Sequence, residues 1–316
     1  MKTGWQMKEQ INVVVIVGFF GTGKTTFLHH FLTQYPEKKI GVIVNDYGAF
    51  HIDDELIENN CVEMREITNG SIFCSCLSDY FQKVLIDFSQ QKIDCLLIEC
   101  SGMADPSNMQ GLIAECGERW KRPYRYRGAI CILDAERIND DFEGSCIAER
   151  QLRCSSIAVV NKSDMIERDD RGRITEMILK VQPEADVFFT SYGRVPYGYL
   201  ENKLFFNGFT DQSLNRMGTV PEVYSLAAEG EQDIGKVTKF VRDVVSYTAR
   251  IKGYVNDRKY RYYIEGKGGL FTVRIAEREE FDNTRIVLIG YDDTDFFNET
   301  CDAWRKNTRT DFILYD

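Results

Sequence analysis

The N-terminal part of the chain alternates short apolar runs rich in β-branched residues with segments whose apolar positions recur every three or four residues. This alternation is typical of β and α units wound around a parallel sheet. The predicted strands are 12–17, 40–44, 93–98, 129–133, 157–160 and 187–189. The predicted helices are 25–33, 79–90, 106–118, 145–153 and 171–181. The pattern therefore predicts an α/β fold with a doubly wound, mostly parallel sheet.

The pattern changes after Asn207, where residues 208–215 are polar and indicate a connector that ends near Pro221. Beyond it we expect one helix and four strands, at 234–247, 249–255, 260–265, 270–275 and 285–289. This grouping is typical of a small α+β domain. The expected organisation is a larger domain, a linker and a smaller C-terminal domain, over residues 1–207, 208–221 and 222–316.

Charge and hydropathy narrow the classes of partner. The chain has 39 Lys and Arg against 49 Asp and Glu, and its net charge of −10 disfavours a protein that coats nucleic acid or an anionic membrane. Two basic, aromatic stretches, 121–127 and 258–263, are interpreted as a surface loop and a half-exposed strand in preference to a base-stacking site. The longest apolar run, 11–20, is much shorter than the roughly 20 residues that span a bilayer. We expect no nucleic-acid partner and no membrane partner.

The cysteines indicate the redox compartment. All 10 are scattered, form no Cys-x-x-Cys pair and lie largely in apolar runs. In such runs cysteine behaves as a small hydrophobic residue. A reducing cytoplasm is therefore expected.

Residues 18–25 fit the pattern G-x-x-x-x-G-K-[ST] between a predicted strand and a predicted helix. In this pattern, backbone N–H groups close around phosphates at the positive end of a helix. Lys24 is expected to reach the β and γ oxygens, and the Thr25 hydroxyl to ligate Mg²⁺. The sequence thus predicts a P-loop NTPase whose nucleotide contacts are Gly18, Gly21, Thr22, Gly23, Lys24, Thr25 and Thr26.

Two more segments place acidic side chains directly after predicted strands. Glu99 lies where P-loop proteins carry their second acidic motif, and three residues on Gly102 can offer a backbone N–H to the γ-phosphate. Asp46 follows the strand 40–44, where a carboxylate can hold the Mg²⁺ hydration shell or orient the attacking water; an Asx-type turn is the alternative. The expected catalytic residues are Lys24, Asp46, Glu99 and Gly102, with Thr25, Asp46 and Glu99 around Mg²⁺.

Residues 161–164, Asn-Lys-Ser-Asp, follow the strand 157–160. The Asp164 carboxylate can accept hydrogen bonds from the ring N–H and the exocyclic amine of guanine, two donors that adenine does not present in that arrangement. The alternative is a strand-to-helix turn in which Asp164 is a cap. Because the tetrapeptide comes after two phosphate motifs, it favours GTP and GDP, with Asn161, Lys162 and Asp164 in the base site.

With these motifs the chain resembles the CobW/UreG/HypB-type GTPases, and it is most similar to the CobW branch. The matching positions are 18–26, 44–48, 52–54, 99–106, 134, 161–164, 190–195, 250–253 and 289–290. The resemblance implies a GTPase domain followed by a CobW-type C-terminal domain, and GTP hydrolysis that depends on Mg²⁺. It also implies delivery of a transition metal or metal cofactor to a client metalloprotein or corrinoid protein. Dimers are common in the wider class, so a homodimer is a further expectation.

The cysteine motif that this family uses for metal is altered here. Where the family usually has Cys-x-Cys-Cys, residues 71–76 read Ser-Ile-Phe-Cys-Ser-Cys. Cys74 and Cys76 provide two soft thiolates for Zn²⁺ or Cu(I), and tetrahedral Zn²⁺ needs about two more ligands. Burial of both cysteines as small apolar residues is the alternative. The candidates for the remaining ligands are Cys61, Asp46 and His51.

Three functions are compatible with these residues. The first is a slow, switch-like GTPase metallochaperone whose nucleotide sets the shape of segments 46–54 and 99–105. The second is a nucleotide-gated chaperone that reshapes a metalloenzyme or corrinoid-protein partner without carrying metal, which the altered cysteine motif favours. The third is a P-loop kinase, in which residues 161–164 would have no task.

Overall fold

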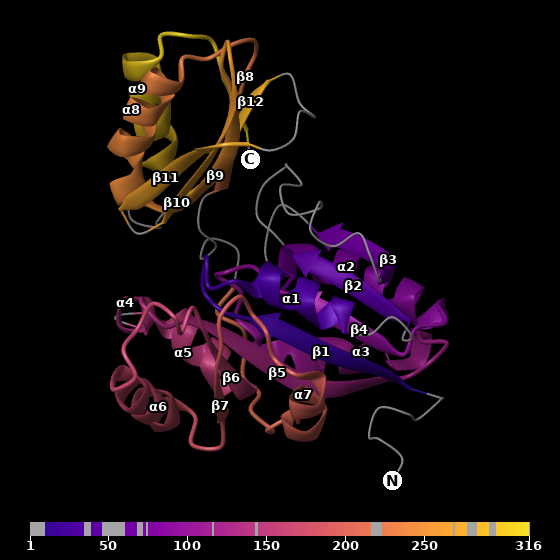
Figure 1. The fold of residues 1–316 in the computed structure, drawn as a ribbon. Coiled ribbons are helices and arrows are strands. Elements are labelled where there is room, and N and C mark those ends of the chain that lie inside the picture. Colours follow the sequence, from indigo (N-terminus) through magenta and orange to yellow (C-terminus); the bar gives the residue numbers. More distant parts are fainter. Residues whose placement is uncertain are drawn as a thin grey trace. The chain divides into compact units, whose positions relative to one another are not determined.

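A computed structural model describes residues 10–34, 39–45, 61–67, 72–73, 75–115, 117–142, 145–215, 223–267, 269–276, 283–290 and 295–315 (Figure 1). At 61–63, 75–77, 118, 140, 267 and 315 it describes the backbone alone. The described residues up to 215 belong to one compact unit, and those from 223 onward belong to a second. Each unit has its own sheet and its own hydrophobic core.

The first unit contains a seven-stranded sheet with the order β3-β2-β4-β1-β5-β6-β7. Every neighbouring pair in it is parallel. The strands are β1 (Ile11–Val17), β2 (Ile40–Asn45), β3 (Cys61–Ile67), β4 (Cys95–Glu99), β5 (Tyr124–Asp134), β6 (Ser155–Asn161) and β7 (Asp186–Phe189). This topology confirms the predicted α/β fold. It also brings the carboxyl ends of all seven strands to one edge of the sheet, where α/β proteins bind ligands.

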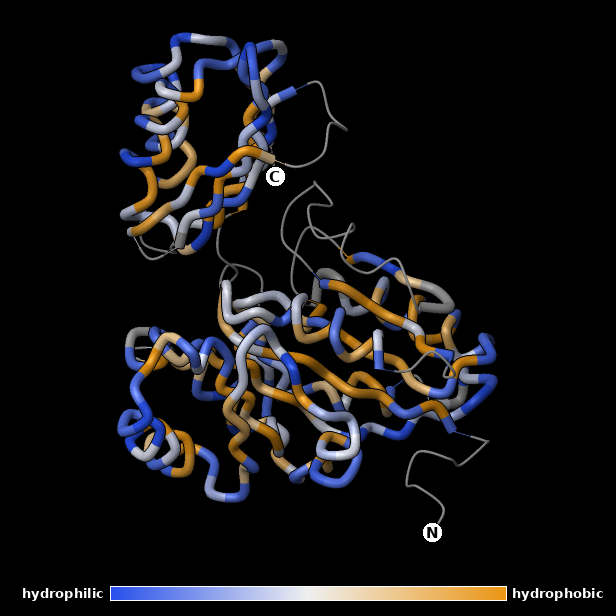
Figure 2. The backbone as a smooth tube through the Cα atoms, in the orientation of Figure 1, coloured by the Kyte–Doolittle hydropathy of each residue, from blue (hydrophilic) through white to orange (hydrophobic). Residues whose placement is uncertain are grey.

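Helices cover both faces of this sheet (Figure 1). One hydrophobic cluster contains side chains of α1 and α7, and another contains those of α2, α3, α5 and α6. The apolar strands between these layers are orange in Figure 2. The helices are α1 (Lys24–Thr33), α2 (Ser75–Gln90), α3 (Met109–Glu115), α4 (Ile138–Phe142), α5 (Cys146–Arg153), α6 (Asp170–Val181) and α7 (Tyr197–Lys203).

The segment expected as one helix over 106–118 is three pieces in the structure. A 3-10 turn (Pro106–Asn108) comes first, then α3, then a second 3-10 turn (Gly117–Arg119). Asp105 causes the tight start, because its side chain accepts a hydrogen bond from the Ser107 N–H and a proline occupies the first position of the turn.

The second unit has a six-stranded antiparallel sheet with the order β11-β10-β9-β12-β8-β13. Both of its helices, α8 (Ile234–Val244) and α9 (Phe296–Asn307), lie on the same face of the sheet (Figure 1). Trp304 and Phe240 are fully buried between helices and sheet. The strands are β8 (Val223–Ala228), β9 (Thr248–Asn256), β10 (Arg261–Lys267), β11 (Leu270–Ile275), β12 (Thr284–Gly290) and β13 (Ile313–Tyr315). This is the smaller α+β architecture that the sequence predicts.

The basic stretch 121–127 serves the first unit internally. Arg122 Nη1 donates to the Ile93 carbonyl over 2.8 Å, and the Tyr124 hydroxyl donates to the Leu85 carbonyl over 2.5 Å. The contacts give the stretch a structural role, but residues 124–127 form the first part of β5 and are not the surface loop that the sequence suggests. The absence of a nucleic-acid partner stays a prediction.

Candidate functional site

The loop between β1 and α1 has a backbone that only glycine tolerates at two positions. Gly18 has φ 143° and Gly23 has φ 97°. A Cβ on Gly18 would lie 2.1 Å from the Ile132 carbonyl oxygen, and one on Gly23 would lie 2.4 Å from Nδ2 of Asn161. Gly21 is also left-handed, with φ 69°. The backbone shape of the predicted phosphate loop therefore depends on these glycines.

Lys24 begins α1, and its side chain lies back over the loop. Its Nζ donates to the carbonyl oxygens of Gly18 at 2.9 Å and Phe19 at 3.2 Å. Thr22 closes the same turn by donating its hydroxyl to the Phe19 carbonyl over 3.0 Å. Thr26, which is also expected to contact the nucleotide, is exposed on the first turn of α1. An ammonium group is thus held beside a loop whose shape suits phosphate.

Thr25 contacts the acidic motif at the end of β4. Its hydroxyl donates to Oε1 of Glu99 over 2.7 Å. The two residues come together because β1 and β4 are parallel neighbours, with Ile16 opposite Glu99. Glu99 is 5% exposed. A hydroxyl and a carboxylate side by side are hard oxygen donors, which suit Mg²⁺.

Gly102 packs directly on the phosphate loop. A Cβ on Gly102 would lie 2.4 Å from the ring of Phe20, which is fully buried. The chain between β4 and Gly102 is held by the Cys100 N–H, which donates to the Ile16 carbonyl over 2.9 Å. Because Gly102 packs against Phe20 with no space between them, a movement of the Gly102 backbone must displace the phosphate loop, and the reverse also holds.

Asn161 joins two loops of the site. It is 3% exposed at the end of β6, and its Nδ2 donates to the Thr22 carbonyl over 2.9 Å. Its Oδ1 accepts from the Gly193 N–H over 2.9 Å. Gly193 in turn packs on α1, since a Cβ there would lie 2.7 Å from Cα of Phe27. Asn161 therefore joins the phosphate loop to the loop after β7 through its side-chain amide.

Lys162 lies beside Asn161 in a strained backbone conformation. Its φ of 57° is left-handed, which costs a non-glycine residue about 1 kcal/mol and is common at functional sites. Its Nζ forms an ion pair of 2.7 Å with Asp134, a buried carboxylate at the end of β5. This ion pair fixes the Lys162 side chain against the end of β5.

Asp164 is exposed and carries a polar partner. The hydroxyl of Ser191 donates to its Oδ1, and this hydrogen bond lowers the pKa of the Asp164 carboxyl below its usual value. An ionised acceptor is the form that can receive two N–H donors of a base. The cap alternative for Asp164 finds no support, because the helix that follows, α6, has Asp169 at its N-cap position.

Three residues that make contacts in this site were not predicted as site residues from the sequence motifs. They are Phe20, Ser191 and Gly193. The two latter lie in the segment 190–195, which the family resemblance marks without a role. Their position could have been inferred from topology, because the loop after β7 emerges beside the end of β6.

At the β2–β3 edge the buried Asn45 links two segments. Its Nδ2 donates to the Ile67 carbonyl over 3.0 Å, and its Oδ1 accepts from the Ile72 N–H over 3.2 Å. Asp46 and Cys74, the expected Mg²⁺ and transition-metal residues nearest to these contacts in sequence, lie outside the described residues.

Cys61 begins β3, opposite Ile40, whereas Ile67 ends β3 opposite Asn45. Six residue-to-residue steps along β3 separate the backbone of Cys61 from that of Ile67 by about 20 Å. This places the backbone of Cys61 away from the carboxyl edge of the sheet. Cys76 lies in the first turn of α2 with its side chain outside the described residues, as is all of His51.

The cysteines whose side chains are described behave as apolar residues, apart from the exposed Cys146. Burial raises the pKa of the Cys154 thiol to about 12, and it raises those of Cys100 and Cys131 too. A raised pKa disfavours the thiolate that binds metal. Within the described ranges no group of three His, Cys, Asp or Glu side chains is arranged to hold a metal ion.

Among the helices described here, none combines the length and the apolar character needed to cross a membrane.

Several proteins are similar to this chain in sequence. The zinc chaperone YjiA of Escherichia coli (strain K12) is 29% identical over 232 residues, which cover 72% of this chain and 70% of YjiA. The zinc-regulated GTPase metalloprotein activator 1 of Saccharomyces cerevisiae is 29% identical over 215 residues, covering 60% of this chain and 50% of the yeast protein. The zinc chaperone YeiR of Escherichia coli (strain K12) is 34% identical over 155 residues, covering 48% and 46%. The match thus spans about half the length of the last two relatives.

Solved structures with a related fold include Zn(II)-bound YjiA GTPase from E. coli, with a TM-score of 0.48 and 21% identity over 94% of this chain and 99% of that one. HypB from Helicobacter pylori in complex with nickel has a TM-score of 0.44 and 22% identity over 59% and 81%. The model of the CobW/HypB/UreG nucleotide-binding domain matches residues 12–189, which contain the phosphate loop, Glu99 and Asn161. Because this match covers more than half of the sequence, the chain belongs to the CobW/HypB/UreG family.

Proposed function

We propose that this protein is a GTPase metallochaperone, which binds and hydrolyses GTP and uses the nucleotide state to deliver zinc to a client metalloprotein. The observation that carries the proposal is the convergence of three groups at one edge of the sheet. These are the phosphate loop with Lys24, the Thr25–Glu99 pair, and the Asp164–Ser191 pair. They provide, in turn, a phosphate site, a cation site and a base site.

Guanine is favoured as the base because Asp164 is held ionised. A carboxylate with a lowered pKa accepts from the ring N–H and the exocyclic amine of guanine, whereas adenine presents an acceptor at the ring position. Lys162 is held against the end of β5 by its pair with Asp134, and Asn161 fixes the loops on which the site depends.

For the phosphates, we assign the backbone N–H groups of residues 18–26 and the Lys24 ammonium, which is already beside the loop. The Thr25–Glu99 pair fits Mg²⁺, and Thr25 and Glu99 would hold the ion. Mg²⁺ held there would offset the negative charge that develops on the phosphate during transfer. Lys24 stabilises the same charge from the side of the loop.

Hydrolysis requires a water in line with the γ-phosphate. Gly102 would donate its N–H to the γ-phosphate from a position against Phe20. Asp46, outside the described residues, is proposed to place the water. Turnover is proposed to be slow and switch-like, because a delivery cycle requires two nucleotide states that each persist long enough to bind or release a partner.

Zinc is proposed as the cargo because relatives named zinc chaperones share the family. Cys74 and Cys76 are the proposed thiolates, and Asp46 is the proposed oxygen ligand in the same part of the chain. Cys61 is left out of the proposed set, because the structure places it at the far end of β3. The rest of the zinc coordination would come from water, the client or a second copy in a homodimer.

The rival function is a nucleotide-gated chaperone that reshapes a metalloenzyme or corrinoid-protein client and carries no metal. The placement of Cys61 away from the carboxyl edge of the sheet favours this rival function. Without Cys61, the proposed site has fewer protein ligands than the four that structural zinc sites use. Both functions would operate in a reducing cytoplasm, where the free cysteines of the described part persist.

The GTPase assignment is tested by phosphate release from GTP and from ATP in the presence of Mg²⁺. We expect kcat/KM for GTP to exceed that for ATP by at least about tenfold. Lys24→Ala should lower GTP turnover by about a hundredfold or more. The control, Lys180→Ala, removes an exposed lysine of α6 and should leave turnover unchanged. Equal turnover by Lys24→Ala and wild type would contradict the assignment.

A further inference from the structure

The acidic motif leads directly into a buried carboxylate that holds the segment 211–215. Asp105 is 0% exposed and its carboxylate accepts from the Leu214 N–H over 2.7 Å. The Asp105 N–H donates to Oδ1 of Asn215 over 2.6 Å, and its carbonyl accepts from the Ser213 hydroxyl over 3.0 Å. Three groups of one residue thus bind three consecutive residues more than a hundred positions away in the chain.

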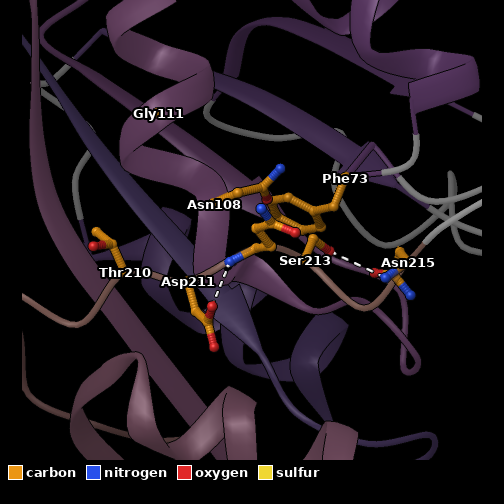
Figure 3. Close-up of a pocket in the computed structure, with 8 residues that line it drawn as sticks. Phe73, Asn108, Gly111, Thr210, Asp211, Ser213 and Asn215 are labelled. Carbon is orange, nitrogen blue, oxygen red and sulfur yellow. Dashed lines mark hydrogen bonds between the residues drawn. The ribbon is translucent and has the colours of Figure 1, made fainter.

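Arg150 of α5 binds both sides of this contact. Its Nε donates to Asp105 over 2.7 Å, and its Nη1 donates to Asp211 over 2.9 Å. Its Nη2 donates to the Gln212 carbonyl over 2.7 Å. The bond from Arg150 lowers the pKa of Asp211 below its usual value, so the pair stays charged near neutral pH. Figure 3 shows Asp211, Ser213 and Asn215 along the same stretch, where they line a pocket.

The opposite end of this contact network reaches the phosphate loop. Gln151 donates from Nε2 to the carbonyls of Gly102 at 3.2 Å and Ala104 at 2.8 Å. Asn215 donates from Nδ2 to the Met103 carbonyl over 2.9 Å. Gly102 itself is in contact range of the Phe20 ring. An unbroken path of packing and hydrogen bonds therefore runs from the phosphate loop through 102–105 to residues 211–215.

We propose that residues 211–215 read the nucleotide state through Asp105 and Arg150, and pass it along the chain toward the second unit. This inference rests on the proposed nucleotide site. When Gly102 moves to meet a γ-phosphate, Asp105 moves with it. A buried carboxylate cannot give up its donors singly without a large cost, so residues 211–215 follow Asp105 or lose its bonds together. Residues 216–222 then connect this segment to β8.

Part of the segment that the sequence predicts to be a linker makes polar contacts within the first unit. The segment 208–215 has the composition of a connector, yet Asp211 donates its N–H to the Ser107 carbonyl over 3.1 Å and the segment belongs to the first unit. A free tether would transmit no conformational change. A tether whose first half is hydrogen-bonded to the acidic motif can do so.

The test is amide hydrogen exchange on the full-length protein with Mg²⁺, compared between GDP and a non-hydrolysable GTP analogue. We expect exchange at Asp211 and Leu214 to differ by at least about tenfold between the two states, because each N–H is bonded within the network. Residues 18–26 should be protected by both nucleotides. Protection at 18–26 with identical exchange over 208–215 would overturn this inference alone. No protection at 18–26 would overturn the proposed nucleotide site and this inference with it.

Substitutions sharpen the test. Arg150→Gln should speed exchange over 208–215 in both states and abolish the difference between nucleotides, while GDP affinity is unchanged. Asp211→Asn, which removes one exposed ion pair, should reduce the difference without threatening the fold. Arg153→Gln is the matched control, because Arg153 lies on the same helix and its side chain pairs with Glu149. A nucleotide-dependent difference that survives Arg150→Gln and Asp211→Asn unchanged would overturn the inference.

Discussion

Thr25 Oγ1 lies 2.7 Å from Glu99 Oε1, although 74 positions separate the two residues in the chain. The contact joins the phosphate loop to the end of the neighbouring strand and creates the oxygen pair that suits Mg²⁺.

Glu99→Gln should therefore lower the rate of GTP hydrolysis by about a hundredfold, because an amide keeps the shape but not the charge that attracts the cation. GDP affinity should change by less than about tenfold, since the loop, Lys24 and the base site remain. Single-turnover phosphate release across a Mg²⁺ titration measures the rate, and calorimetric titration with GDP measures the affinity. Glu176→Gln on the exposed face of α6 is the control. A Glu99→Gln protein with normal turnover at low Mg²⁺ would remove Glu99 from the cation site.

Gly18→Ala should destabilise the protein by about 1–3 kcal/mol and abolish nucleotide binding, because its backbone is left-handed and the new methyl group would clash with the Ile132 carbonyl. Urea unfolding measures the stability change. Gly172→Ala, within α6 and with open space around it, is the opposite case and should stabilise by about 0.5–1 kcal/mol. Similar unfolding midpoints for the two variants would contradict the assigned loop geometry.

Ser191→Ala should shift the pH dependence of GDP affinity. In the proposed base site guanine binding needs ionised Asp164, so affinity is present above the pKa of this carboxyl and lost as pH falls through it. The Ser191 hydroxyl holds that pKa below its usual value, so its removal raises the pKa and the loss of affinity moves to higher pH. Calorimetric titrations at a series of pH values measure the midpoint. Asp164→Asn should bind GDP weakly at every pH, because an amide does not titrate in this range.

The apolar pattern predicts most of the first unit because its strands are buried on both faces. β1, β4 and β6 each contain an apolar run of at least four residues, and each is followed by one of the predicted motifs. β3 was not predicted, because this edge strand has no apolar run and Glu66, next to Arg65, breaks the alternation of apolar and charged residues. α9 was not predicted either, although its Trp304 is fully buried.

The sequence predicts those residues of the candidate site that belong to a contiguous motif. The phosphate loop and Glu99 follow from local patterns, since each motif is a strand followed by a turn. The bond between Ser191 and Asp164 depends on two loops that meet only because β6 and β7 are neighbours. The contacts of Asp105 depend on a segment more than a hundred residues away, so no local pattern reveals them.

Alkylation of the reduced protein should separate the cysteines by environment. Cys146 is exposed and should react first among the cysteines whose side chains are described. Cys154 should stay unmodified until the protein unfolds, because burial raises the pKa of its thiol to about 12. If Cys74 and Cys76 bind zinc, Zn²⁺ should protect them and leave the Cys146 rate unchanged. Peptide mass mapping at increasing times gives each rate, and protection confined to Cys146 would contradict the proposed site.

The most direct test of the whole account is the zinc affinity of the reduced protein, measured against a chromophoric competitor with Mg²⁺ and either GDP or a non-hydrolysable GTP analogue. For a GTP-gated zinc chaperone we expect stoichiometric binding whose Kd differs by at least about tenfold between the two nucleotides. We also expect that Cys74→Ser/Cys76→Ser loses this binding and that Cys146→Ser retains it. Equal affinity in both nucleotide states, or binding that survives the double substitution, would contradict a GTP-gated zinc chaperone. An absence of binding in both states would favour the chaperone that reshapes its client without carrying metal.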